Sequence, residues 1–282
     1  MCVNICKYNS IFFKARKVAG FELEENNNAS ELSAVKNIEL YRLDEHDIDF
    51  LEKISRANKE NSLFVSSAND LNSSKNLKSI IHESINHIIA SLTMHKFFNL
   101  PYDPIHLLAI ADKKPVGIIT GMSPKIDRNL KITYSITNKK GEVETDWIAS
   151  WSNKNGIRIK GLGKVLLSQF YYMVIKSGYK VKSFYTRSEV PEKSIALQFY
   201  KKLGLKPVKD CIRRKMDEPY DPVELNLLFI NKGRKLSKLP VIPMRINRKK
   251  AEENIQKVFQ KYKRQDYMEQ TGFVNLNDIA SI

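Results

Sequence analysis

The stretch that decides the fold reads Arg158-Ile159-Lys160-Gly161-Leu162-Gly163-Lys164 and runs on into the apolar residues Val165, Leu166, Leu167 and Phe170. Two glycines stand among basic residues just before a helical apolar pattern. The first turn of a helix has backbone N–H groups without intrahelical acceptors, and the helix dipole adds positive charge there. Because glycine has no Cβ, such a backbone can approach a phosphate closely. The stretch therefore predicts an anion-binding loop at the start of a helix.

Two common phosphate-binding loops are excluded here. The P-loop pattern G-x-x-x-x-G-K-[ST] is absent, and the third glycine of the dinucleotide-binding fingerprint is missing. Taken alone, the stretch is equally typical of a glycine-containing turn before an ordinary helix.

A second stretch follows further along the chain, where Lys193 to Leu205 reads KSIALQFYKKLGL. Together the two stretches resemble the GNAT superfamily of acyl-CoA-dependent N-acyltransferases, in which an R-x-x-G-x-G loop precedes an N-x-x-A-x-x-[FL]-Y-x-x-x-G-F helix. The matching residues are Arg158, Gly161, Gly163, Ala196, Phe199, Tyr200 and Gly204. Two positions depart from the family pattern, because Lys193 replaces Asn and Leu205 replaces Phe.

The resemblance implies an α/β (α+β) fold with a mixed, mostly antiparallel central sheet flanked by helices. We expect a flexible N-terminal segment over 1–36, an acyltransferase domain over 37–230, and a basic C-terminal extension with a helix over 231–282. Alternating apolar residues predict strands. The expected strands are 38–43, 106–111, 116–121, 131–137, 143–151, 181–186, 205–216 and 223–230. We expect 131–137 and 143–151 to form a hairpin, and 205–216 and 223–230 to form another.

The resemblance also implies that acetyl-CoA is the acyl donor. The residues expected to hold it are Arg158, Ile159, Lys160, Gly161, Leu162, Gly163 and Lys164 in the glycine loop, Ile148, Ala149, Ser150 and Trp151 on the strand that pairs with the pantetheine, and Lys193 and Ala196 in the second motif. Tyr200 matches the family tyrosine that protonates the departing thiolate. A phenol with an ordinary pKa near 10 suits that role. The alternative for Tyr200 is a half-buried helix aromatic.

Two carboxylates are candidates for the general base. Glu144 and Asp146 alternate on one face of the strand that enters the glycine loop, where the family often places a carboxylate. Asp146 lies nearer the expected site. An isolated surface carboxylate, with the amine deprotonated through water, is the alternative. Trp147 and Trp151 are expected on the opposite face of the strand.

The charge of the chain favours anionic partners. Lys and Arg number 47 against 31 Asp and Glu, which gives a net charge of +16. Such a field attracts nucleic acid, acidic protein, phosphate cofactors or anionic lipid without choosing among them. We therefore expect a macromolecular acceptor, a protein amine or an aminoacyl-tRNA. Two alternatives stay open: a non-catalytic module that binds nucleic acid or an acidic partner, and a translocated effector with an Asn-rich head.

Other classes of protein are disfavoured by the composition. The three cysteines form no C-x-x-C pair and the five histidines show no metal-ligand spacing, so no metal site is expected. No apolar run approaches the length of a membrane span or a signal peptide, which predicts a cytoplasmic protein. Near the C-terminus, basic residues lead into a predicted helix over 249–268 with one apolar face, which either packs onto the domain or binds an anionic surface.

Overall fold

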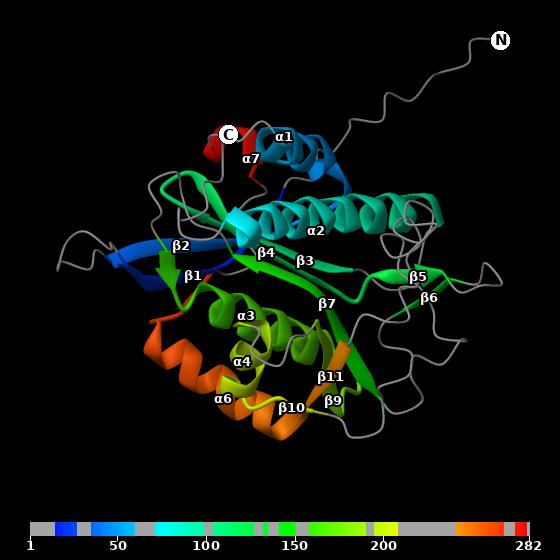
Figure 1. Cartoon of the computed structure of the whole chain (residues 1–282), viewed down its shortest axis with the longest axis vertical. Coiled ribbons are helices and arrows are strands. Elements are labelled where there is room, and N and C mark those ends of the chain that lie inside the picture. The colour runs from blue at the N-terminus through cyan, green and yellow to red at the C-terminus, as the bar shows by residue number, and fades with distance from the viewer. Residues whose placement is uncertain are drawn as a thin grey trace, which may run out of the picture.

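The computed structural model describes residues 15–26, 35–59, 71–98, 104–126, 132–134, 141–150, 158–189, 195–207, 241–267 and 274–280. Within this part of the chain, ten strands form one sheet with helices on both faces (Figure 1). The strand order is β10-β11-β9-β7-β4-β3-β2-β1-β12, and β8 pairs with β1. All the described pairings are antiparallel except that of β7 with β9. The predicted fold class, a mixed and mostly antiparallel sheet flanked by helices, is confirmed.

The strands of the sheet are β1 Arg16–Asn26, β2 Val35–Arg42, β3 Ile105–Ala111, β4 Lys114–Gly121, β7 Glu142–Ser150, β8 Arg158–Lys160, β9 Ser183–Glu189, β10 Lys206–Pro207, β11 Val241–Asn247 and β12 Gln265–Asp266. A separate hairpin consists of β5 Pro124–Ile126 and β6 Ile132–Tyr134. The helices are the 3-10 helix η1 Glu45–Asp47, α1 Ile48–Lys59, α2 Leu71–Phe98, α3 Leu162–Lys176, α4 Ile195–Lys202, α6 Arg248–Lys261 and α7 Leu276–Ile279.

Two apolar layers hold the helices to the sheet. The central strand β3 reads IHLLAIA and is buried at every position, as expected for a strand that is covered on both faces. Its Leu107 and Ala109 pack in the layer that contains α3 and α6, while Leu108 and Ile110 pack in the layer that contains α1 and α2. We call these the α3 face and the α2 face of the sheet. None of the described helices is long and apolar enough to cross a membrane.

The expected flexible segment over 1–36 is wrong for part of its length. Residues 16–26 form β1, which pairs antiparallel with β2 from Arg16 opposite Arg42 to Glu24 opposite Val35. Ala19, Phe21 and Leu23 are buried at every second position. That alternation is the ordinary strand pattern, but a strand forms only because β2 and β12 lie on its two sides.

The expected boundary at 230 does not separate the sheet from a C-terminal extension. β11 comes from beyond that boundary, yet it lies inside the sheet between β9 and β10. Of the predicted strand 205–216, only Lys206–Pro207 is a described strand, and the predicted strand 223–230 lies outside the described residues. The predicted hairpin of 131–137 with 143–151 is also wrong: β6 pairs with β5, and β7 pairs with β4 and β9. Between those two strands β7 is covered on both faces, with Val143 in the α3-face layer and Ala149 in the α2-face layer.

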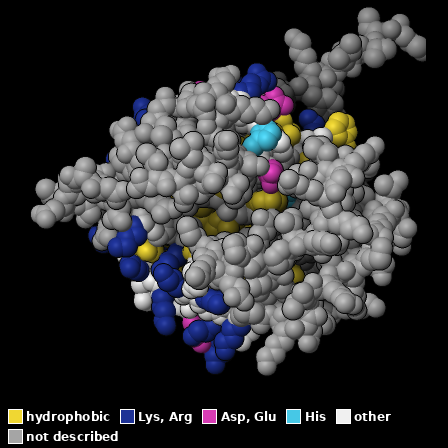
Figure 2. All heavy atoms as spheres, viewed as in Figure 1, with side chains coloured by type: hydrophobic (Ala, Val, Ile, Leu, Met, Phe, Trp, Pro, Cys, Tyr) yellow, Lys and Arg dark blue, Asp and Glu magenta, His cyan; other side chains and the backbone are white. Residues whose placement is uncertain are grey.

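The chain after β11 passes from one face of the sheet to the other. The predicted helix over 249–268 is correct only for its first part, because α6 ends at Lys261 and Gln265–Asp266 form β12. α6 packs on the α3 face through Ala251, Ile255, Val258 and Phe259. β12 then pairs with β1, and α7 packs Leu276 into the layer of α1 and α2 on the α2 face. The outward residues of α6 include Lys249, Lys257 and Lys261, and Lys and Arg side chains gather in this region of the surface (Figure 2).

Candidate active site

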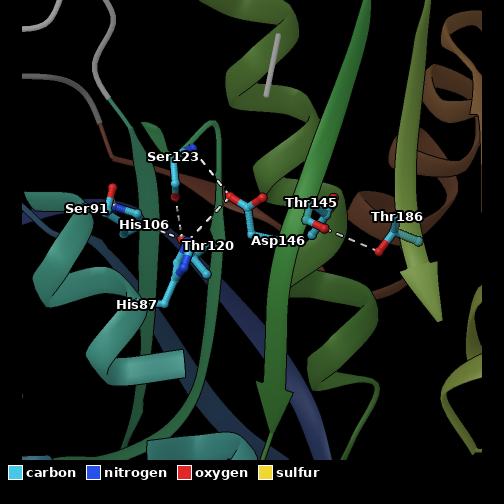
Figure 3. Close-up of polar contacts among 8 residues, drawn as sticks. All are labelled: His87, Ser91, His106, Thr120, Ser123, Thr145, Asp146 and Thr186. Atoms are coloured by element: carbon cyan, nitrogen blue, oxygen red, sulfur yellow. Dashed lines mark hydrogen bonds and ion pairs between the residues drawn. The ribbon is translucent and has the colours of Figure 1, made fainter. Parts of the chain in front are cut away.

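The central feature of the candidate site is a fork between β7 and β9. These parallel neighbours pair from Glu142 opposite Ser183 to Thr145 opposite Thr186, and there the pairing ends. β7 nevertheless continues to Ser150 and β9 to Glu189. At the fork, the Thr186 hydroxyl donates a hydrogen bond to the Thr145 carbonyl at 3.3 Å. Beyond this point the two ribbons part (Figure 3).

A β-bulge lies on β7 at the same level. Thr120 of β4 faces Trp147 while Gly121 faces Thr145, so Asp146 is the extra residue of the bulge. A Cβ on Gly121 would overlap the Phe170 ring and lie 2.9 Å from the Glu144 carbonyl oxygen. The Asp146 side chain is only 1% exposed, although the residue as a whole is partly exposed. Its exposure therefore belongs to the main chain.

The Asp146 carboxylate points into the α2 face and meets groups from two other elements (Figure 3). Its Oδ2 accepts a hydrogen bond from the Ser123 N–H at 3.3 Å and lies 3.7 Å from His87 Nε2. Ser123 follows β4 and His87 comes from α2. Both are fully buried. The predicted base is thus an enclosed carboxylate with defined neighbours.

The polar contacts continue from Ser123 across the buried face. Its hydroxyl lies 3.3 Å from the hydroxyl oxygen of Thr120, which in turn lies 2.6 Å from His106 Nδ1. His106 Nε2 lies 3.0 Å from Ser91 Oγ on α2. Burial lowers the pKa of His106 well below the ordinary value of 6.5, so its ring is neutral at neutral pH. We call these six residues (His87, Ser91, His106, Thr120, Ser123 and Asp146) the α2-face network.

Tyr200 occupies the other side of the fork, on the α3 face. It is a residue of α4, it is 6% exposed, and its hydroxyl hydrogen-bonds with the Thr186 side chain. Burial raises the pKa of Tyr200, and the contact with Thr186 offsets part of that rise. The phenol therefore keeps its proton at neutral pH. Tyr171 of α3 lies nearby and stacks on Phe184 with ring centroids 3.9 Å apart.

The glycine loop lies between β8 and α3. β8 pairs with β1 from Lys160 opposite Glu24 to Arg158 opposite Asn26, and α3 begins at Leu162. Gly161 is the N-cap residue with φ +92°, a left-handed conformation that favours glycine. The N-terminus of α3 has no side-chain cap, and its first turn has no acidic residue. Lys164 stands there instead, which is unfavourable for the helix dipole unless an anion is nearby.

Packing explains much of why these two positions are glycine. A Cβ on Gly161 would overlap the ring and hydroxyl of Tyr262, which follows α6. A Cβ on Gly163 would lie 3.2 Å from the Phe199 ring of α4. The N-terminus of α3 is therefore held closely between α4 on one side and the end of α6 on the other.

The remaining predicted site residues are distributed as follows. Ile148 packs against the α3-face layer, Ala149 is buried in the α2-face layer and Ser150 is exposed. Ile159 is partly buried, Lys160 exposed and Leu162 buried. Arg158 lies in β8 and Ala196 in α4, whereas Trp151 and Lys193 lie outside the described residues. Glu144 is partly exposed and lies opposite Tyr185 of β9.

The expectation that Trp147 lies on the opposite face from Asp146 is wrong. Trp147 is paired with Thr120, and directly paired residues share a face of the sheet. Because Thr120 belongs to the α2-face network, Trp147 is on the α2 face as well. The bulge inserts one residue and so reverses the alternation that the sequence pattern assumes.

The histidines of the α2-face network were not predicted as site residues. His87 and Ser91 are spaced i, i+4 on α2 and are fully buried among Ile85, Ile88 and Leu92. Two polar residues on the apolar stripe of a helix were the available indication. Among the described residues, one group could hold a metal ion, formed by Asp44, Glu45 and His46. Asp44 there caps η1 by accepting the His46 N–H at 2.8 Å, which accounts for the group.

No protein-family model matches the chain, and no curated protein matches it. Several solved structures are similar. An acetyltransferase of the GNAT family from Desulfovibrio desulfuricans has 13% identity and a TM-score of 0.42 over 75% of this chain and 99% of its own. The PaiA N-acetyltransferase from Thermoplasma acidophilum, in complex with coenzyme A, has 17% identity and a TM-score of 0.41 over 74% of this chain and 98% of its own. An uncharacterized protein from Bacillus halodurans has 12% identity and a TM-score of 0.43 over 87% of this chain and 99% of its own.

Proposed function

We propose that the chain is an acyl-CoA-dependent N-acyltransferase with acetyl-CoA as the donor. The observation that carries the proposal is the fork of β7 and β9, which has Tyr200 at its base and is followed along the chain by the uncapped N-terminus of α3. An acyl thioester supplies an activated acyl group and a thiolate leaving group. The chain has to hold the phosphates, align the thioester and supply a proton.

Phosphate binding is assigned to the glycine loop. The first-turn N–H groups of α3 and the side chains of Arg158, Lys160 and Lys164 would hold the pyrophosphate. Because the first turn has no acidic side chain and no side-chain cap, an anion there would meet no carboxylate of that turn and would displace no cap. Ile159, Gly161, Leu162 and Gly163 contribute backbone to the same loop.

The pantetheine arm is assigned to the C-terminal half of β7. Pairing with β9 ends at Thr145, so an extended chain can hydrogen-bond the main chain of residues 148–150 as an added strand. Trp151, Lys193 and Ala196 are proposed as further residues that contact the cofactor. This placement brings the thioester to the fork, between Tyr200 on the α3 face and the bulge of β7.

Proton transfer is assigned to Tyr200 and to one carboxylate. The phenol keeps its proton at neutral pH and is placed to donate it as negative charge develops on the departing sulfur. Glu144 is partly exposed and can accept the amine proton directly or through water. The 1% exposed carboxylate of Asp146 is less accessible to an incoming amine, although it lies at the same fork.

A second feature favours an anionic macromolecule as the carrier of the acceptor amine. Basic side chains outnumber acidic ones on the outward face of α6 (Figure 2). α6 packs beside α3, and Tyr262, which follows its last residue, lies next to the glycine loop. A protein with an acidic surface or an aminoacyl-tRNA would fit this charge. The same surface would serve a non-catalytic module that binds such a partner, and this is the alternative function.

Titration with acetyl-CoA tests the proposal. Both tryptophans of the chain, Trp147 and Trp151, lie on or just after β7, so intrinsic fluorescence reports on ligand there. We expect saturable binding that Lys164→Glu weakens at least tenfold and Gly163→Glu abolishes. Lys176→Glu makes the same change of charge at the other end of α3 and should bind like the parent. If the parent shows no saturable binding, or if Lys164→Glu and Lys176→Glu behave alike, the proposal is wrong.

A further inference from the structure

The α2-face network places six polar side chains in the interior of the protein. Five of its six residues are fully buried, and the sixth, Asp146, has a 1% exposed side chain. They come from α2, β3, β4, the residues after β4, and β7, and they lie beside an otherwise apolar layer of Ile and Leu. Burying polar groups is unfavourable unless they are well paired, and an apolar cluster of the same volume often gives equal or greater stability. Stability therefore does not explain the network.

The position of the network indicates a different role. It ends at Asp146, which is the extra residue of the β7 bulge and follows directly on the last residue that pairs with β9. The side chain of Asp146 is enclosed by the network, while its main chain is exposed at the fork. The buried side chain of Asp146 thus holds β7 from the α2 face. It thereby fixes how the main chain of Asp146 is oriented at the fork, where the thioester is proposed to lie.

We propose that Asp146 is a positioning residue, which fixes the bulge of β7 through the Ser123 N–H and His87 and thereby orients the main chain that faces the thioester. This inference rests on the proposed function and assigns no proton transfer to Asp146. Polar networks of this kind restrict motion, because each member accepts or donates in only a few directions. A misplacement of about 1 Å at a reacting centre lowers turnover by roughly 10²-fold. A group that holds the main chain in place can therefore be important for turnover even where it adds nothing to the stability of the fold.

Two substitutions separate positioning from base catalysis. Asp146→Ala removes the anchor, and we expect turnover at saturating acetyl-CoA to fall at least tenfold with a small change in acetyl-CoA affinity. Asp146→Asn keeps an oxygen that can accept the Ser123 N–H, and we expect it to keep at least a third of parental turnover. If Asp146→Asn is as inactive as Asp146→Ala, Asp146 acts as a base and the proposal is overturned. Parental turnover in Asp146→Ala overturns it too.

A matched control separates positioning from simple destabilisation. Ser84→Ala removes another fully buried polar group of α2, outside the network, and should lower thermal stability without lowering turnover. If Asp146→Ala does not fold, His87→Ala takes its place, because it removes the ring 3.7 Å from the carboxylate.

A second readout does not depend on enzymatic activity. Amide hydrogen exchange of the peptide that covers residues 145–150 should be faster in Asp146→Ala than in Ser84→Ala or the parent. If the parent transfers no acyl group to any amine, the proposed function fails while this measurement still decides whether Asp146 holds the bulge. Equal exchange in all three proteins would overturn the positioning role even if the chain proves to be an acyltransferase.

Discussion

Tyr262, just after the last turn of α6, fills the space that a Cβ on Gly161 would occupy at the start of α3. The main-chain carbonyl of the same tyrosine accepts a hydrogen bond from the N–H of Glu22 on β1 at 3.0 Å. A segment from the C-terminal part of the chain thereby joins the glycine loop to the N-terminal strand. This contact leads directly to a prediction about stability.

Gly161→Ala should destabilise the fold by about 2–5 kcal/mol. Roughly 1–2 kcal/mol comes from a side chain at φ +92°, and about 1–3 kcal/mol from overlap with Tyr262. Gly178→Ala is the matched control, because φ is +82° there and no atom lies within 4 Å of the added Cβ. Denaturant unfolding measures both changes. In a Tyr262→Ala background the two glycine substitutions should become equal, and a persistent difference would show that the overlap is not the cause.

Tyr200→Phe should lower turnover roughly 10²-fold and leave acetyl-CoA affinity unchanged, because the hydroxyl acts only when charge develops on sulfur. The ring stays in place, so stability should fall only by the roughly 1 kcal/mol expected for the lost hydrogen bond with Thr186. Since burial raises the pKa of Tyr200, the alkaline loss of activity in the parent should begin above pH 10. Tyr172→Phe, which removes a hydroxyl from the far side of α3, is the control. Parental turnover by Tyr200→Phe would remove this residue from the mechanism.

Asp47 should make stability fall as pH rises from about 4 to about 7. Burial raises the pKa of Asp47 from 3.8 to about 7, and the N–H groups of Asp44 and Ala15 offset part of the rise. The folded chain keeps this proton at pH values where the unfolded chain has lost it, so rising pH favours unfolding across that window.

Asp47→Asn tests this relationship, since the amide can still accept the N–H of Asp44. The free energy of unfolding of the variant relative to the parent should rise by an amount on the order of 3 kcal/mol between pH 4 and pH 8. Asp49→Asn makes the same change of net charge at an exposed position of α1 and serves as the control. A relative stability that does not vary with pH would contradict the prediction.

The basic face of α6 should bind polyanions. Lys257→Glu combined with Lys261→Glu should weaken binding of single-stranded RNA and reduce the steepness of its salt dependence. Lys53→Glu combined with Lys96→Glu makes an identical change of net charge on helices of the α2 face and should have little effect. Deleting residues 245–282 would be uninformative, because β11 and α6 belong to the folded core. If the two double variants show the same salt dependence of RNA binding, α6 does not bind the polyanion and its basic residues are only exposed to solvent.

Local patterns predicted the elements whose causes are local. The apolar repeats of α3 and α6, the glycine that begins α3, and the apolar runs of β3 and β4 all follow from residue types at a fixed spacing. The glycine loop and Tyr200 were identified in the same way, from two short motifs. The structure brings the two motifs together, because Gly163 lies against the ring of Phe199, the residue before Tyr200, and neither motif alone required that contact.

Tertiary structure alone decided what depends on pairing between distant residues. β11 takes its place between β9 and β10, and β1 becomes a strand only beside β2, because ladder hydrogen bonds join residues that no local pattern relates. The bulge at Asp146 reverses the alternation that put Trp147 on the wrong face. The buried contacts of Asp146 with Ser123 and His87 exist because separate elements converge on one point, and the amino-acid sequence by itself determined only that these polar residues were present.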